Sequence, residues 1–383
     1  MTVVDFSLDV EQLALKSEAE EFAVAAVAKY GRFNDSWLCS FSRECSQELA
    51  ARGWIGMTWP KEFGGGGRSP VDRLIVSEAL ITAGVPIGAT WFADRQMGPG
   101  LFTFGTPEQC ERYLPEILAG DVTWCIGMSE PNSGSDLASL STSAVRDGDE
   151  WVVNGQKVWT SGAQNSQMGV LLARTGEEPR NRGISMLLIP MNQPGVEVRP
   201  LRQITGEAEF NEVFFTDARV PRDWVVGEVN DGWRAATGLL AHERSSLGKV
   251  GADAKREANV SAAVPFHYLL DIAIRTGHNT NFNTRQELVS AYIGEKVMSW
   301  TGQRKVHPSI GKLWRTKQAR YVAAVGARMA MSGAAAHEIG DKDGEFWMYH
   351  ILNAPRMSLG GGTDEIQKNT IGERALGLPR EPS

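Results

Sequence analysis

Apolar residues recur with a helical period over the first third of the chain. Val10, Leu13 and Phe22 lie on one side of the segment 9–27, for which Asp9 is a suitable N-cap. The segments 71–85 and 105–121 also have the residue pattern of helices, and Gly120 is suited to end the second helix. Residues 53–67 interrupt the pattern with a glycine run. This run neither follows a clear strand nor opens a clear helix, so it does not predict a nucleotide-binding loop.

From about residue 121 the period changes to two. Short strands are predicted at 123–130, 150–161, 168–174, 183–191, 195–201 and 211–221. The pairs Asp147-Gly148 and Asn154-Gly155 predict hairpin turns, because Asn and Gly accept positive φ. These segments predict a compact β domain of about 110 residues.

Helices are again predicted from Gly232 onward, in the segments 234–252, 285–303 and 319–339. The order of helices, then strands, then helices predicts an α+β protein. We expect an N-terminal helical domain over 1–118, a central β domain over 119–228 and a C-terminal helical domain over 229–383.

Composition narrows the function classes. The chain has 383 residues and a formal net charge of −7, which argues against a general nucleic-acid binder. It contains no apolar run near the roughly 20 residues of a membrane span, and its N-terminus does not have a signal-peptide pattern. The four cysteines show neither metal-ligand spacing nor a dense disulfide framework. We therefore expect free thiols and a cytoplasmic protein.

Four motifs carry a family resemblance. They are MSEPNSGSDLASL (128–140), NGQKVWTSGA (154–163), RGISMLLIP (182–190) and GGTDEIQKNTIGERALGLPR (361–380). In this order and spacing they resemble the flavin-dependent acyl-CoA dehydrogenases over essentially the whole chain. The resemblance implies an N-terminal α-domain, a central β-barrel and a C-terminal four-helix bundle. It further implies one FAD per subunit, usually in a tetramer, and electron transfer to an electron-transfer flavoprotein.

The resemblance assigns flavin contacts in the β domain. Met128 and Ser129 close a strand, where backbone groups can bond the edge of a flat, partly polar ring. Trp159 is expected beside the flavin and the Ser161 hydroxyl near its reactive nitrogen. By itself, Trp159 would more simply be a core residue. Ser135 is expected near the CoA portion of the substrate and at the cofactor.

The C-terminal loop is expected to hold the cofactor too. The resemblance places Thr363 and Glu365 on the FAD side, and the neighbouring glycines let the backbone approach closely. Dehydrogenation of an acyl thioester also requires a carboxylate that removes the α-proton. Most relatives carry that glutamate directly before the Gly-Thr of this loop, where this chain has Gly361.

A different glutamate is therefore predicted as the base. Part of the family places it in a Glu-Arg pair on an earlier helix, which corresponds to Glu243 and Arg244. Leu239 and Leu247 lie four residues to either side, so Glu243 falls in an apolar stripe that would raise its pKa. A solvated Glu-Arg pair is the simpler interpretation without the family motifs. Arg244 is expected to orient the helix or to meet the CoA nucleotide.

The competing base candidates are Asp364 and Glu365, which follow the Gly-Thr on the cofactor side. Relatives that form homotetramers carry Arg-x-x-Phe-Gly early in the C-terminal half, but here Arg275 remains without the Phe-Gly. A Gln-x-x-Gly-Gly element also looks absent. We therefore hypothesise a catalytic subunit that forms a homo- or heterotetramer, with a non-identical partner favoured.

Two alternatives remain besides an acyl-CoA dehydrogenase for a bulky, branched or steroid-derived acyl group. One is a flavin oxidase or monooxygenase on the same fold, against which Glu243 argues. The other is a cofactor-sharing subunit of a heteromeric acyl-CoA dehydrogenase, which would be expected to lack both glutamates.

Overall fold

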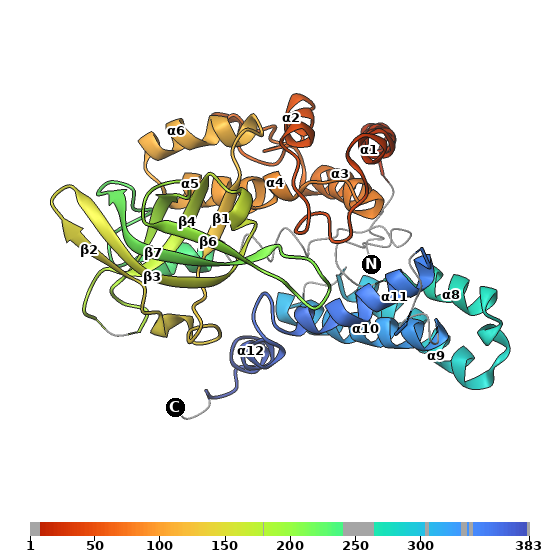
Figure 1. The fold of residues 1–383 in the computed structure, drawn as a ribbon. Helices are drawn as coiled ribbons and strands as arrows, with labels where there is room; N and C mark the ends of the chain where they lie inside the picture. The colour runs from red at the N-terminus through yellow and green to blue at the C-terminus, as the bar shows by residue number, and fades with distance from the viewer. Residues whose placement is uncertain are drawn as a thin grey trace. The chain divides into compact units, whose positions relative to one another are not determined.

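The computed structural model describes residues 8–178, 180–239, 264–302, 306–330, 335–336 and 340–380. The chain forms two compact units. One is Val10–Leu247, and the other is Met1–Asp9 together with Gly248–Ser383. Each unit is described separately below, and Figure 1 shows the elements by label.

Helices come first in the unit Val10–Leu247. They are α1 (Val10–Tyr30), α2 (Arg43–Ala51), α3 (Pro70–Ala83), α4 (Gly88–Phe92), α5 (Gly98–Phe104) and α6 (Pro107–Leu118), with a π-helical turn η2 (Ala93–Met97) between α4 and α5. Capping boxes with proline at the start fix the first turns of α3 and α6, through Ser69 and Thr106. The predicted helical segments 9–27, 71–85 and 105–121 correspond to α1, α3 and α6.

One seven-stranded sheet follows the helices. Its strands are β1 (Trp124–Gly127), β2 (Ser143–Asp147), β3 (Glu150–Ser161), β4 (Met168–Arg174), β5 (Ile184–Pro190), β6 (Val196–Leu201) and β7 (Phe210–Pro221). The order is β1-β4-β2-β3-β7-β6, with β5 paired to β4. β1 runs parallel to β4, and the long pair β3–β7 is antiparallel. In Figure 1 helices α4 and α5 lie beside β1 and β4.

The strands differ in which of their residues are buried. β4 and β5 are buried at every residue except the last, so the predicted period of two does not hold in these two strands. β3 alternates inward and outward, and its inward residues Trp151 and Val153 join the sheet core. The core of the sheet therefore lies against the face where β3 presents Trp151 and Val153.

One of the two predicted hairpin turns is wrong. The Asp147-Gly148 turn connects β2 to β3 as expected, with Gly148 at φ 62°. Asn154 and Gly155, in contrast, lie inside β3 at a register shift opposite β7. A Cβ at Gly155 would lie 2.6 Å from the Thr142 hydroxyl, and its φ is +147°. The glycine is needed for a bulge and a close approach, not for a turn.

The second unit is helical. Its described helices include α8 (Phe266–Arg275), α9 (Phe282–Gly302), α10 (Pro308–Met329), α11 (Lys342–Asn353) and α12 (Asp364–Thr370). α8, α9, α10 and α11 share a core that includes Leu269, Ala291, Val325 and Trp347. Gly326 allows Trp347 to lie against α10, since a Cβ there would meet the indole at 2.0 Å. The predicted α+β class, with helices on either side of a central sheet in the sequence, is confirmed.

Two composition-based expectations can also be compared with the structure. Among the described residues no helix is both long and apolar enough to cross a bilayer. All four cysteines are free; Cys45 and Cys125 are buried, whereas Cys39 and Cys110 are half-buried. Burial raises the pKa of Cys45 and of Cys125 to about 12, so these two thiols are unreactive.

Candidate functional site

The chain that leaves β1 presents a backbone donor. Lys157 Nζ donates to the Met128 carbonyl oxygen at 3.0 Å, and the Val158 N–H donates to the Ser129 carbonyl oxygen at 2.9 Å. Both carbonyls of this dipeptide are therefore engaged by β3. The Ser129 N–H finds no acceptor among the residues that the structure describes. It is available to an acceptor from outside the chain.

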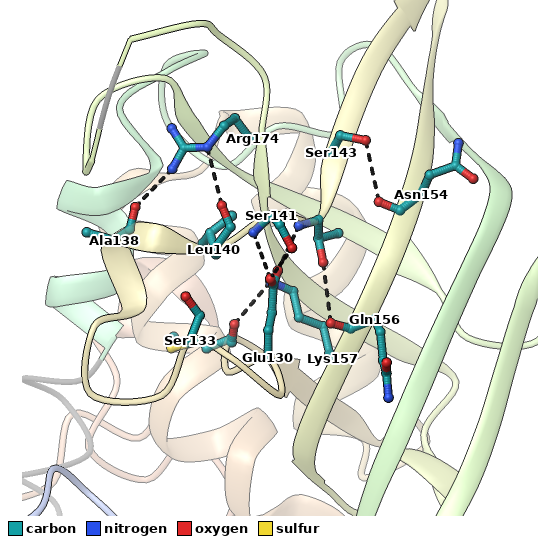
Figure 2. Close-up of polar contacts among 12 residues, drawn as sticks. Glu130, Ser133, Ala138, Leu140, Ser141, Ser143, Asn154, Gln156, Lys157 and Arg174 are labelled. Carbon is teal, nitrogen blue, oxygen red and sulfur yellow. Dashed lines mark hydrogen bonds and ion pairs between the residues drawn. The ribbon is translucent and has the colours of Figure 1, made fainter.

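A buried ion pair lies under this dipeptide. The side chain of Lys157 is fully buried, and its ammonium lies 2.8 Å from Glu130 Oε1. The Glu130 carboxylate also accepts from the backbone N–H groups of Ser141 and Thr142 and from the Ser141 hydroxyl. Figure 2 shows these groups converging on the carboxylate from β3 and from the loop before β2. Every buried oxygen of Glu130 is thus satisfied, as a buried charge requires.

The pair is charged at neutral pH. Burial by itself would raise the pKa of Glu130, but the ammonium of Lys157 and the hydrogen bonds from residues 141–142 lower it to about 2. Burial lowers the pKa of Lys157 to about 8, and the attraction of Glu130 opposes that effect. An ammonium and a carboxylate therefore face each other inside the protein at pH 7.

Trp159 projects from the sheet two residues after Lys157. It has φ 61° and lies at the register shift between Lys157 and Thr160. Its side chain is 59% exposed and contacts Phe210 edge to face at 6.0 Å. The simpler expectation, a tryptophan packed into the core, does not hold. A left-handed backbone at a non-glycine residue often marks a functional position.

Ser161 is the last residue of β3, and hydrogen bonds hold the backbone on both sides of it. The neighbouring Gly162 N–H donates to the Glu209 carbonyl oxygen at 2.8 Å. Asn211, fully buried on β7, donates from Nδ2 to the Thr160 carbonyl oxygen at 2.9 Å. These bonds fix the chain on both sides of the Ser161 hydroxyl.

Ser135 lies on the loop that connects β1 to β2. It is exposed, and a Cβ at the preceding Gly134 would touch nothing within 4 Å. Arg174 at the end of β4 anchors the same loop by donating to the carbonyl oxygens of Ala138 and Leu140 (Figure 2). Ser135 thus lies on an exposed part of the loop, whose residues Ala138 and Leu140 are held by Arg174.

A cavity of about 310 Å³ adjoins Gly162 in the same unit. Cys39, Glu207 and Glu209 line part of it, with their sulfur and carboxylate oxygens within 4.8 Å of one another. Clustered carboxyl groups repel phosphate oxygens. This cavity is therefore unsuited to the pyrophosphate of a dinucleotide or of CoA.

The C-terminal loop in the second unit forms a helix start. Thr363 caps α12, with its hydroxyl accepting from the Ile366 N–H at 3.2 Å. Gly361 and Gly362 have φ 66° and 88°, and Gln367 Nε2 donates to the Gly361 carbonyl oxygen at 2.8 Å. A Cβ at Gly361 would meet nothing within 4 Å among the described residues. The position of the usual family glutamate is thus open.

The two acidic residues after Thr363 differ in their surroundings. Asp364 forms an ion pair with Lys312 of α10 at 2.9 Å, and both side chains are largely buried. The Glu365 side chain is 76% exposed and lies 4.0 Å from Lys368. The predicted cofactor role of Glu365 stays a prediction.

The predicted base lies outside the described residues. Residues 232–239 are helical, and Leu239 is fully buried. Glu243 and Arg244 come directly after this segment, beyond the part of the chain that the structure describes. Their assignment rests on the sequence.

Sequence reasoning missed Glu130, Lys157 and Asn211. Lys157 could have been found, because simple alternation from Trp151 and Val153 places it on the inward face of β3. A lysine there requires a buried acid. Asn211 gives no comparable signal, since its role depends on the pairing of β7 with β3.

Comparisons with known proteins agree with this architecture. Residues 9–121 match the acyl-CoA dehydrogenase N-terminal domain, and residues 125–218 match the acyl-CoA dehydrogenase middle domain. The acyl-CoA dehydrogenase IpdE1 of Mycobacterium tuberculosis is 41% identical over 350 residues, 88% of either chain.

Two solved structures are similar over nearly the full length. One is described as the Tcur3481–Tcur3483 steroid ACAD, with a TM-score of 0.85, 28% identity and coverage of 99% of this chain and 100% of that one. The other is the ChsE4–ChsE5 complex from Mycobacterium tuberculosis, with a TM-score of 0.82, 27% identity and coverage of 99% and 100%.

These matches define a flavin-dependent class of oxidoreductases. The chain belongs to the acyl-CoA dehydrogenase family. The expected family and enzyme class are confirmed.

The described residues fit a flavin. The Ser129 N–H without an acceptor can bond the edge of the ring, and the exposed Trp159 indole offers an aromatic face. Trp159 directly follows Val158, whose N–H bonds the Ser129 carbonyl oxygen, so the two features are neighbours where the chain after β1 meets β3.

Proposed function

We propose that the chain is an FAD-dependent acyl-CoA dehydrogenase that introduces an α,β double bond into an acyl-CoA thioester. The observation that carries this proposal is the pairing of an unsatisfied Ser129 N–H with an exposed, left-handed Trp159 inside the family motifs. Met128, Ser161, Ser135, Thr363 and Glu365 complete the proposed cofactor contacts. A bound flavin would supply the hydride acceptor for the β-hydrogen.

Glu243 removes the α-proton in this proposal. Gly361 has no side chain to act as a base, and in the sequence Glu243 lies four residues from Leu247 and four from Leu239, which is buried. An apolar environment disfavours the carboxylate and raises its pKa toward that of an effective general base. Arg244 is proposed to orient this helix or to meet the CoA nucleotide.

The acyl group is proposed to be bulky, branched or steroid-derived. The open space at Gly361 supports this, since no side chain stands where most relatives carry a glutamate. The similarity to a structure described as a steroid ACAD supports the same substrate class. Electron-transfer flavoprotein is the proposed electron acceptor.

A non-identical partner subunit is proposed as well. Arg275 remains from the element that reaches a neighbour's cofactor in homotetrameric relatives, but Asp271 and Asp343 both bind its guanidinium. The similarity to the ChsE4–ChsE5 complex supports a heteromer. Native mass spectrometry of the chain alone tests this, and a homotetramer with one FAD per chain would contradict it.

Anaerobic bleaching of the flavin tests the reaction and the base together. CoA thioesters of graded length, branching and ring content are added, and those that are substrates should bleach the visible absorption of the flavin in the native protein. Glu243→Gln should retain the flavin and abolish bleaching. Asp364→Asn and Glu365→Gln test the competing bases. Loss of bleaching in one of these, with normal bleaching in Glu243→Gln, would overturn the assignment.

A further inference from the structure

We propose that the buried Glu130–Lys157 pair polarises the Met128–Ser129 peptide group, so that the Ser129 N–H becomes a strengthened donor to the reduced flavin. This inference rests on the proposed function, because it presupposes a flavin at the edge of the sheet. It assigns a positioning role to two residues that would not touch the cofactor themselves.

The peptide geometry provides the first step. The Met128 carbonyl and the Ser129 N–H belong to one planar trans peptide group and point in opposite directions. Lys157 Nζ binds the carbonyl oxygen at 3.0 Å from inside the protein. The Ser129 N–H therefore points away from the ammonium, and it finds no acceptor among the described residues.

The charge of Lys157 provides the second step. Its side chain is fully buried, so water does not screen the field of the ammonium at the carbonyl. A positive charge on the oxygen of a peptide group draws electron density toward it, which makes the N–H more acidic. Hydrogen bonds in a chain strengthen one another in this way.

Glu130 keeps the ammonium in place. Its carboxylate is itself held by the N–H groups of Ser141 and Thr142, so both partners of the ion pair are fixed. Figure 2 shows Lys157 extending from β3 toward the carboxylate. A surface lysine would be too mobile and too screened to direct a field at one carbonyl.

The strengthened donor would favour the reduced flavin over the oxidised flavin. A reduced flavin carries more negative charge than an oxidised one, so a strengthened N–H donor stabilises the reduced form more. Removing Lys157 should shift the reduction potential to more negative values. We expect about a tenfold change in the reduction equilibrium, which corresponds to about 30 mV for a two-electron couple.

The double variant Glu130→Gln/Lys157→Met tests this without leaving a lone buried charge. Arg174→Met is the matched control, because Arg174 anchors the same loop through Ala138 and Leu140 but does not contact Met128. The reduction potential is measured spectroscopically against redox dyes, together with the FAD dissociation constant and the melting temperature of the apoprotein.

The expected result is a negative potential shift in the double variant and none in Arg174→Met, although both lower the melting temperature. Equal potentials in all three proteins would overturn the inference and leave the pair a structural element. Failure of the proposed function gives a different signature, in which the native protein neither retains FAD nor bleaches with thioesters. If the double variant does not fold, Glu130→Gln/Lys157→Gln, which keeps a donor at position 157 but no buried charge, replaces it with the same expected shift.

Discussion

Arg275 on α8 is bound at two points by Asp343 on α11, 68 residues further along the chain. Asp271 binds the same guanidinium from one turn earlier at 2.8 Å. The cation is therefore neutralised within its own unit. A pyrophosphate would have to compete with two carboxylates for it.

Arg275→Ala is expected to leave the flavin content of the purified enzyme unchanged. The ion pairs are about half exposed, so their loss should lower the free energy of unfolding by less than about 1 kcal/mol. Absorbance measurements of flavin per chain and urea unfolding provide the check. A marked loss of FAD would show that Arg275 serves a cofactor after all.

Gly155→Ala should destabilise the sheet by about 2–3 kcal/mol. The new methyl group would lie 2.6 Å from the Thr142 hydroxyl, at a φ of +147°. Gly148→Ala is the matched control, since Gly148 also has positive φ but open space around it, and should cost about 1 kcal/mol. Urea unfolding of the two variants measures the difference; equal losses would mean that the close approach is unimportant.

Acid stability should depend on Glu130. The pKa of this carboxyl is about 2 in the folded protein, below its ordinary value of 4.5. Its contribution, about 3 kcal/mol, is therefore fully present above pH 4.5 and is lost as the pH falls through 2. The stability difference between the native protein and Glu130→Gln should shrink over this range.

Thermal unfolding from pH 6 to pH 2 measures that difference. Glu197→Gln is the control, because Glu197 forms an exposed pair with Arg199 and should change stability by less than about 1 kcal/mol throughout. A difference between native protein and Glu130→Gln that stays constant with pH would contradict the assigned ion pair.

Trp159→Ala should weaken FAD binding but change the stability of the fold little. Since more than half of the indole is exposed, the variant should lose no more than about 1 kcal/mol of unfolding free energy. Trp59→Ala, which removes a side chain only 1% exposed, should cost about 3–5 kcal/mol. FAD titration of the apoproteins should show weaker binding in Trp159→Ala; unchanged affinity would remove Trp159 from the flavin site.

Local patterns predict most of the fold, because the signals lie within a few residues of each other. The predicted strands 168–174 and 183–191 correspond to β4 and β5, and the predicted helical segments 71–85 and 105–121 to α3 and α6. The Asn154-Gly155 error has a long-range cause. Whether this dipeptide turns or continues depends on Thr142, which only the folded sheet brings beside it.

The family motifs name single candidate residues of the site, and their contacts with a flavin stay predictions. Trp159 and Ser129 are neighbours through the hydrogen bond from the Val158 N–H to the Ser129 carbonyl oxygen. The partners of Lys157 and Arg275 are 27 and 68 residues away in sequence. No local period encodes such pairings, so they emerge only from tertiary packing.

The left-handed backbone at Gly361 has a consequence for how this sequence can change over generations. A glutamate restored there would pay about 1–3 kcal/mol of conformational strain. A change of Gly361 to glutamate therefore carries a stability cost that the same change at an ordinary backbone position would not.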